Sequence, residues 1–324
     1  TLTAETGGAT IEATDGALGV TTLNAKEHAA LTSGGAMEVS EATAGSVAAK
    51  AGTTLHVKKL TSTGEATLTS KDEATLDDVT AGTLAAESTA GSVKAGTLTA
   101  KTGEASVTAK TDVTIGTLKA EAGGAKIEAT EGKLDVTTLN AKEHAELTSG
   151  GDMVLHEAEA GGKLTTSAGG SISVKGTDAK ISGSTIEMTA KKDIRITDRS
   201  PVGKLDGVDT SVPAGSTTGS GAAGSLVTGE AKPHDFDASG KGSALLSSAG
   251  GKVTLSAKKV EIDTLVNGEG GTADLTISAD NIGIDDLAGV GAQHVTIHGK
   301  DGQSQAHYAG IHSTAEGGTL VKDS

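Results

Sequence analysis

Four histidines lie close together near the C-terminal end of the 324-residue chain: His294, His298, His307 and His312. Four imidazoles within nineteen residues could bind a transition metal, because neutral imidazole is a preferred ligand for zinc and copper. Their spacing, however, matches no compact zinc-binding signature. We therefore expect them to be solvated surface residues and predict no metal site.

Two other histidines each follow a glutamate, in the sequence Asn-Ala-Lys-Glu-His-Ala. His28 and His144 occupy equivalent places in two long repeats of the chain, as do Asn24 and Asn140. A histidine next to a carboxylate could take part in acid–base catalysis. Because the same group returns with the repeat, we expect His28 and His144 to be turn residues. We expect the asparagines to close a turn or to begin an amide ladder.

The least repetitive group of polar residues is His234-Asp235-Phe236-Asp237, which contains the single Phe of the chain. Carboxylates grouped around an aromatic ring on a loop could bind calcium or a sugar. The spacing does not follow the calcium-binding loop of an EF-hand. We take these four residues as the best ligand-binding candidates. We predict no catalytic residues, no cofactor and no metal.

Much of the chain consists of internal sequence repeats. Residues 1–40 and 117–156 are identical at 29 of 40 positions, and an apolar-x-Ala/Ser anchor recurs every 18 to 21 residues from Leu2 to Ala158. A period near nineteen is typical of a solenoid, in which each repeat buries its apolar face by stacking on its neighbours. The anchors are Leu2, Leu23, Ala42, Leu60, Val79, Leu98, Leu118, Leu139 and Ala158.

Composition and alternation favour β-structure over helix. Phe236 and Tyr308 are the only aromatic residues, whereas Gly numbers 47. Apolar and polar residues alternate in Ala9–Ala13, in Ser171–Lys175 and in Lys252–Ala257, and Gly-Gly or Asp-Gly pairs separate such runs. This pattern predicts short strands joined by turns. We expect about three strands per coil, stacked in parallel as a triangular β-helix.

The regular pattern is interrupted once. All three prolines, Pro201, Pro213 and Pro233, and a Gly/Ser-rich run lie in residues 200–242. Proline cannot donate a hydrogen bond to a strand ladder. We therefore predict a β-helical shaft over 1–199, an insertion over 200–242 that leaves the shaft and can be shortened without unfolding it, and a continued shaft over 243–324. Because repeats reach both ends, we expect a fragment of a longer protein.

The charge and composition also exclude several classes of protein. The chain carries 42 acidic and 27 basic residues, for a net charge of −15, and has no cysteine. We predict no nucleic-acid binding, which needs concentrated Lys and Arg, and no disulfides. No run of eighteen apolar residues occurs, so we expect no membrane insertion.

Two other functions share this architecture. Polysaccharide-cleaving β-helices need clustered carboxylates in a groove with long walls, whereas here the acids are spread one or two per coil. An ice-binding rod needs Thr-x-Thr on nearly every coil, whereas the motif occurs only at intervals: Thr1-Leu2-Thr3, Thr67-Leu68-Thr69 and Thr97-Leu98-Thr99. We expect a protein that is not an enzyme.

The repeats resemble those of the filamentous-haemagglutinin family, the large exoproteins of bacterial two-partner secretion. Gly7–Ala13 and Gly251–Lys259 carry the resemblance, and within the family the acidic, Thr/Ala-rich composition looks most like Cdr-type biofilm-matrix adhesins. The resemblance implies a right-handed parallel β-helix, an outer-membrane partner transporter and an extracellular or cell-surface location. Contact-dependent toxin-delivery proteins have similar shafts.

We therefore expect an all-β, right-handed parallel β-helix with three strands per coil and one inserted excursion. Its expected function is that of a stalk in an adhesin that promotes aggregation or biofilm-matrix attachment. The expected partners are extracellular polysaccharide or sister adhesin molecules. The alternatives are a carbohydrate-active β-helix enzyme of the polysaccharide lyase or hydrolase kind and the shaft of a contact-dependent toxin-delivery protein.

Overall fold

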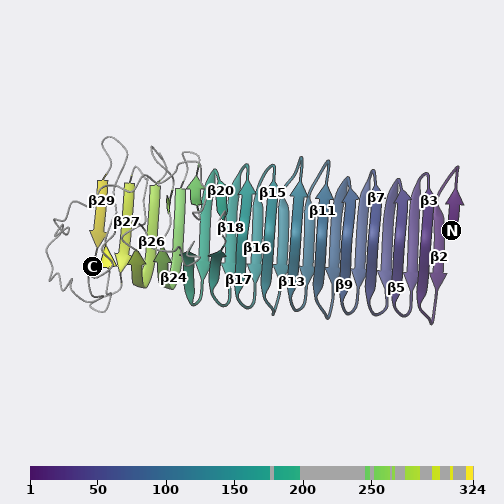
Figure 1. Cartoon of the computed structure of the whole chain (residues 1–324), viewed down its shortest axis with the longest axis horizontal. Coiled ribbons are helices and arrows are strands. Elements are labelled where there is room, and N and C mark those ends of the chain that lie inside the picture. The colour runs from purple at the N-terminus through teal and green to yellow at the C-terminus, as the bar shows by residue number, and fades with distance from the viewer. Residues whose placement is uncertain are drawn as a thin grey trace, which may run out of the picture.

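The chain forms one long parallel β-solenoid (Figure 1). The computed structural model describes residues 1–175, 179–197, 245–248, 252–262, 265–266, 274–284, 294–299, 307–308 and 319–323, and these contain strands and turns but no helix. Every described strand pairing is parallel, and a strand in the middle of the rod, such as β10, pairs with the strand one coil before and the strand one coil after it. The predicted parallel β-helix is confirmed.

Each regular coil contains a short strand and a long strand. The short strands form one face of the rod, which we call face A: β2 (Ala9–Ala13), β4 (His28–Ser33), β6 (Ser46–Ala51), β8 (Glu65–Ser70), β10 (Thr83–Ser88), β12 (Ala105–Ala109), β14 (Ala125–Ala129), β16 (Ala145–Ser149), β18 (Lys163–Ala168) and β21 (Thr185–Ala190). The long strands are β3 (Leu18–Ala25), β5 (Met37–Ala44), β7 (Leu55–Ser62), β9 (Ala74–Ala81), β11 (Val93–Ala100), β13 (Val113–Ala120), β15 (Leu134–Ala141) and β17 (Met153–Ala160).

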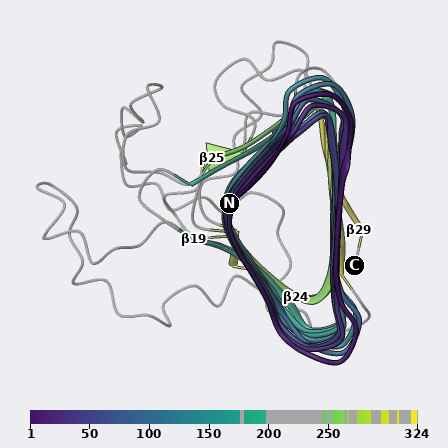
Figure 2. The same ribbon diagram turned by 90° about the vertical axis from the view of Figure 1, so that its right-hand side faces the viewer.

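The long strands bend in the middle, and this bend makes the coil three-sided. In β7 two consecutive exposed residues, Lys58 and Lys59, interrupt the alternation of buried and exposed side chains. The register skips one residue at the same place, since Val57 pairs with Leu76 and Lys59 with Asp78. We call the first half of each long strand face B and the second half face C. Viewed along the rod, the coils superpose as a triangle (Figure 2).

The three strands expected per coil are found in the first unit as β1 (Leu2–Ala4), β2 and β3, and β3 continues into the next unit, where its Leu23 pairs with Leu2. Gly7-Gly8 and Asp15-Gly16 form the turns between them. Later coils depart from this pattern. They comprise β19 (Ile172–Lys175), β20 (Lys180–Gly183), β22 (Asp193–Thr197), β23 (Leu245–Ser248), β24 (Lys252–Ile262), β25 (Leu265–Val266), β26 (Asp274–Ile284), β27 (His294–Gly299), β28 (His307–Tyr308) and β29 (Thr319–Asp323).

The break in the sequence pattern coincides with one corner of the coil. β19 and β20 pair with the two halves of β17, so β19 lies on face B and β20 on face C. β22 and β23 stack on β19 and β20, and Lys180 pairs directly with Leu245. The described chain therefore ends at Thr197 and resumes at Leu245 beside this corner, and the predicted insertion, residues 200–242, lies outside the described residues and stays a prediction.

The core is a set of columns running along the rod. The predicted anchors are register partners throughout, from Leu2 on Leu23 to Leu139 on Ala158. The coil spacing predicts one continuous core lined by Leu2, Ile11, Leu23, Leu98, Leu118, Ile127 and Leu139. Of these seven, Leu23, Leu98, Leu118, Ile127 and Leu139 are buried. The prediction is wrong for Leu2, which is 40% exposed, and Ile11 is only half-buried. β1 and β2 each pair on one side only, so the first coil is covered by one neighbour.

Glycine is required where one turn stacks directly on the next. The amide of Gly52 donates to the carbonyl of Ser33 in the coil before, at 2.8 Å. A Cβ at Gly52 would lie 2.0 Å from the carbonyl oxygen of Gly34. Any side chain there would push the turns apart and break the hydrogen bonds between coils.

We predict that Ile127→Asp destabilises the rod strongly. The side chain is 1% exposed and stacks between Val107 and Leu147, so an aspartate would place an unpaired charge in the core. Such burial costs about 3–5 kcal/mol. Urea unfolding measures the loss. Lys126→Asp, on the exposed side of the same strand, is the matched control and should change stability little; equal effects would contradict the assignment of the core.

We predict that Thr166→Val stabilises the rod. Thr166 is 1% exposed in the core column between Leu147 and Met188, and its hydroxyl has no hydrogen-bond partner. Replacing an unsatisfied buried hydroxyl by a methyl group of the same shape should add about 1 kcal/mol. Thermal unfolding of this variant and of Thr165→Val, which faces outward, tests the prediction. A lower melting temperature for Thr166→Val would contradict it.

Candidate functional site

The best ligand candidates from the sequence, His234, Asp235, Phe236 and Asp237, lie outside the described residues, so they stay predictions. The strand pairings show on which faces three of the C-terminal histidines lie. β27, which contains His294 and His298, pairs with the first half of β26, and β28, which begins at His307, pairs with its second half. These histidines therefore belong to different faces of the coil. His312 lies outside the described chain.

His28 and His144 share a structural environment in the two repeats. A Cβ at Gly8 would lie 2.2 Å from the ring of His28, and one at Gly124 would lie 2.5 Å from the ring of His144. Each ring therefore covers a glycine of the preceding coil. The sequence predicts that His28 and His144 are turn residues. This needs correction, because His28 is the first residue of β4 and His144 directly precedes β16. Neither histidine lies in a catalytic arrangement with the adjacent glutamate in any contact of the described chain.

The two asparagines do not close turns. Asn24 lies in β3 and Asn140 in β15, both on face C. The side-chain amide of Asn140 donates to Glu159 on the next coil, at 3.4 Å, and Glu159 also pairs with Lys180 on the coil after that. The amide thus begins a polar ladder along the rod.

Charged side chains on faces B and C pair with charges on adjacent coils. Lys58 donates to Glu38 at 2.7 Å, and Lys59 lies 3.6 Å from Glu41. His56 lies 3.3 Å from Asp77. The lysine beside Glu38 lowers the pKa of that carboxyl, first through their hydrogen bond, and the same contact raises the pKa of Lys58. These charges are neutralised along the rod and do not converge on one point.

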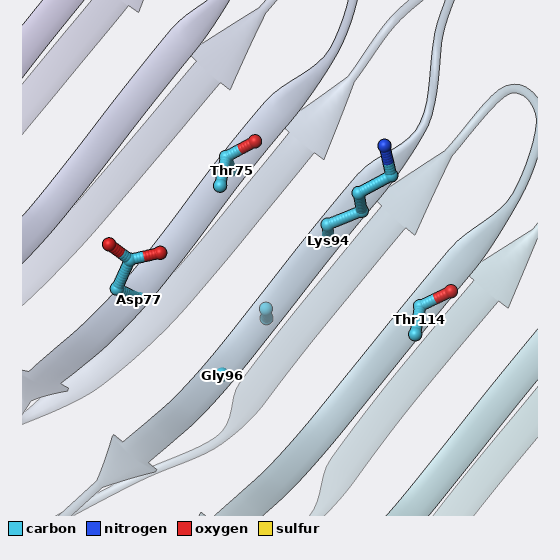
Figure 3. Close-up of a pocket in the computed structure, with 6 residues that line it drawn as sticks. Thr75, Asp77, Lys94, Gly96 and Thr114 are labelled. Atoms are coloured by element: carbon cyan, nitrogen blue, oxygen red, sulfur yellow. The ribbon is translucent and has the colours of Figure 1, made fainter.

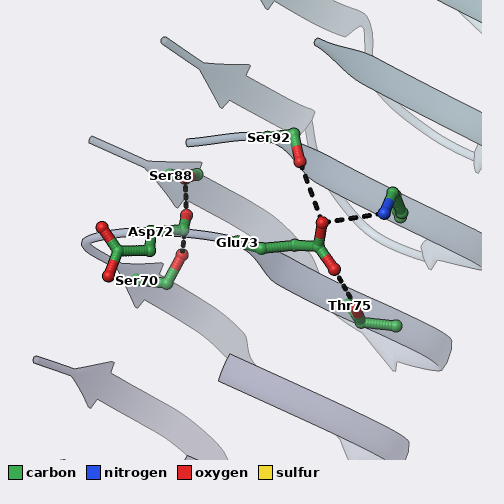
Figure 4. A network of polar contacts seen from close by, with 7 residues as sticks. Ser70, Asp72, Glu73, Thr75, Ser88 and Ser92 are labelled. Atoms are coloured by element: carbon green, nitrogen blue, oxygen red, sulfur yellow. Dashed lines mark hydrogen bonds and ion pairs between the residues drawn. The ribbon is translucent and has the colours of Figure 1, made fainter. Parts of the chain in front are cut away.

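The most connected carboxylate is Glu73, at the turn from face A to face B (Figure 4). Its oxygens accept hydrogen bonds from Lys94 at 2.8 Å, Ser92 at 3.3 Å and Thr75 at 3.4 Å. The hydrogen bond from Lys94 is the main cause of the lowered pKa of Glu73. In the same turn, the carbonyl of Asp72 accepts hydrogen bonds from Ser70 and Ser88. This network fixes the lysine in place on face B.

Lys94 also borders an open depression of about 240 Å³ (Figure 3). Thr75 and Asp77 come from β9, Lys94 and Gly96 from β11, and Thr114 from β13. The depression exists because Gly96 stands at the corner between faces B and C, where the two preceding coils carry Lys58 and Asp77. Hydroxyl, ammonium and carboxylate groups here are spaced by the coil rise, about 4.8 Å. They could hydrogen-bond a polyol, but the lining contains one carboxylate, and glycoside hydrolysis needs two.

A second, smaller depression of about 130 Å³ lies on face A. It crosses β4, β6 and β8, and its lining includes His28, Ser46, Glu65, Ala30, Ala48 and Thr67. The two depressions lie on different faces, so they do not form one groove. The Thr-x-Thr motifs are also divided, because Thr67 and Thr69 lie on face A whereas Thr97 and Thr99 lie on face C.

The described residues contain no group of three or more histidines and carboxylates placed to hold a metal ion, and no helix there is long and apolar enough to cross a bilayer. Comparisons with protein-family models, with curated proteins and with solved structures found no match. The surface of the rod therefore has to be interpreted from its own geometry.

We predict that the network around Glu73 gives a small, pH-dependent stabilisation. The pKa of Glu73 is lowered in the folded chain. Its contribution is therefore present above the ordinary carboxyl pKa and is lost as the pH falls through the folded value. Because the pair is largely exposed, we expect only about 0.2–1 kcal/mol. Urea unfolding should show that Glu73→Gln destabilises at pH 7 and converges with the parent at low pH.

Glu146→Gln is the control for this measurement, because Glu146 is exposed and forms no ion pair within the described chain. An equal effect of both substitutions at pH 7 would show that the hydrogen bonds of Glu73 do not contribute to stability.

Proposed function

We propose that the chain is the structural stalk of a large secreted or cell-surface bacterial adhesin. The observation that carries this proposal is the register of a parallel β-solenoid, which stacks outward polar residues such as Lys94 on Thr114 and Glu41 on Lys59 along the rod. Each coil places its outward side chains about 4.8 Å from those of the coil before. Such a surface suits many weak contacts, which together gain affinity by avidity.

The partners we propose are extracellular polysaccharide and sister molecules of the same kind. Exposed Thr, Ser, Lys, Glu and Asp side chains, such as those around the depression at Gly96, offer donors and acceptors to sugar hydroxyls. The net charge of −15 repels strongly anionic polymers and favours neutral or cationic polysaccharides. Secretion through an outer-membrane partner transporter, with an extracellular location, is the part of the proposal that rests on the family resemblance.

The distribution of carboxylates supports a stalk over an enzyme. Several acids of the described coils pair with lysines or histidines of neighbouring coils, as Glu38, Glu41 and Asp77 do, and the others are spread along the rod. A polysaccharide lyase or hydrolase instead concentrates its carboxylates at one groove. The alternative of a carbohydrate-active enzyme therefore has less support.

We predict that glycan binding depends on valency. A neutral β-glucan immobilised at high density should retain beads carrying many copies of the chain, whereas the dispersed chain should bind it barely detectably. A polyuronate surface is the charge control and should retain fewer beads at low salt. Submicromolar binding of a short oligosaccharide by the dispersed chain, or release of reducing ends from the polymer, would overturn the stalk proposal.

A further inference from the structure

Face A carries a set of charges that have no partner within the rod. In its outer column Lys50 of β6 and Glu87 of β10 are exposed and form no ion pair in the described chain. Thr69 of β8 lies between them in register. Two coils separate the charged residues by about 9–10 Å, so their backbones hold them too far apart for a direct ion pair. The ion pairs Lys58–Glu38 and Lys59–Glu41 on faces B and C, and Lys163–Glu187 further along face A, instead join residues of adjacent coils.

The column beside these charges is flat over five coils. Its residues are uncharged and short: Ala30, Ala48, Thr67, Ala85 and Ser106. The depression on face A follows this column. Because successive coils superpose along the rod (Figure 2), the column is straight and a second straight surface could follow it.

The second long repeat differs at this same column. Thr10 and Ala30 of the first repeat correspond to Lys126 and Glu146, which are register partners of opposite charge. In the second repeat this column therefore carries opposite charges on adjacent coils, whereas in the first repeat it is uncharged. This contrast distinguishes face A of β4–β12 from the equivalent face further along the rod.

We propose that face A of β4, β6, β8, β10 and β12 binds the same face of a second copy of the chain in antiparallel orientation. A two-fold axis at the level of β8 would place Thr67 opposite Thr67 and Thr69 opposite Thr69. Lys50 of each copy then lies opposite Glu87 of the other, giving two reciprocal ion pairs, and Ala48 lies opposite Ala85. The proposal rests on the proposed function and specifies its sister-molecule partner.

Charge complementarity selects this orientation. In a parallel arrangement each coil would lie opposite the same coil of the second copy. Lys50 of one copy would then be at the same height along the rod as Lys50 of the other. The antiparallel contact is also limited in length, because Glu12 would meet Glu128 beyond its ends. Near the axis Glu65 would lie opposite its own copy, which is the one unfavourable meeting within the contact. The contact therefore has a defined centre and defined ends.

The contact is small. Five coils of about 4.8 Å and a strand width of about 20 Å cover roughly 400–500 Å² on each partner. A stable interface usually buries about 800 Å² per partner. We therefore expect a weak, salt-sensitive association of the isolated chain that strengthens when many rods are held together.

Sedimentation velocity over a range of concentrations of the full chain tests the proposal, with charge reversal as the variable. Lys50→Glu and Glu87→Lys should each weaken association by about tenfold or more, and the double variant should restore it, since the reciprocal pairs are then re-formed with opposite signs. Glu65→Gln should strengthen association. Lys126→Glu, on the same face but outside the contact, is the control and should leave it unchanged.

Thermal unfolding of each variant separates loss of association from loss of folding. A second variant, Ala48→Arg, places a bulky side chain at the centre of the contact and should abolish association while the rod stays folded. A chain that stays monomeric at every concentration, or a double variant that associates no better than the single variants, would overturn the proposal. Glycan binding by densely coated beads is measured separately, so its failure would count against the polysaccharide part of the proposed function alone.

Discussion

The structure depends on hydrogen bonding between parallel coils in fixed register. Strands take their main-chain partners from adjacent coils, so the backbone of one coil dictates where the next one lies. Because buried amides and carbonyls must be paired, a coil cannot shift along its neighbour without losing a whole ladder. Inward side chains are thereby forced into columns, where they contact residues about nineteen positions away.

The two long repeats show which positions this constraint controls. Of the eleven differences between residues 1–40 and 117–156, only Val39, which corresponds to Leu155, is at a buried position. The other differences lie on the outside, where a side chain meets solvent and the coil above or below. Core columns accept little change because a cavity or an overpacked residue is felt by both neighbouring coils. The outside is free to acquire charge, and charge is what distinguishes the two repeats.

The same constraint explains where the chain can depart from its repeat. β19 and β20 replace one bent strand, and the ladder continues from β20 to β23 even though 65 positions separate Lys180 from Leu245. An insertion at a corner leaves both flanking ladders intact, whereas an insertion within a face would displace the register of that face. A rod built in this way can carry different surfaces along its length on an unchanged core.

The sequence by itself determined the solenoid, its parallel strands, its anchors and the corner glycines. These follow from a period near nineteen and from the alternation of apolar and polar residues, both of which are local or repeated properties. It did not determine the exposure of Leu2, because burial there depends on a neighbouring coil on each side. The sequence also led us to expect His28 and His144 in turns, whereas in the tertiary structure each ring packs on a glycine of the coil before.

Only the tertiary structure decided which charges meet. The coil length varies from 18 to 21 residues, so the period alone leaves the partner of any outward side chain uncertain by one or two positions. A shift of one position turns a residue from the outside to the inside of the coil. The pairing of Glu73 with Lys94, and the separation of Lys50 from Glu87 by a whole coil, are therefore properties of the register that the backbone hydrogen bonds impose.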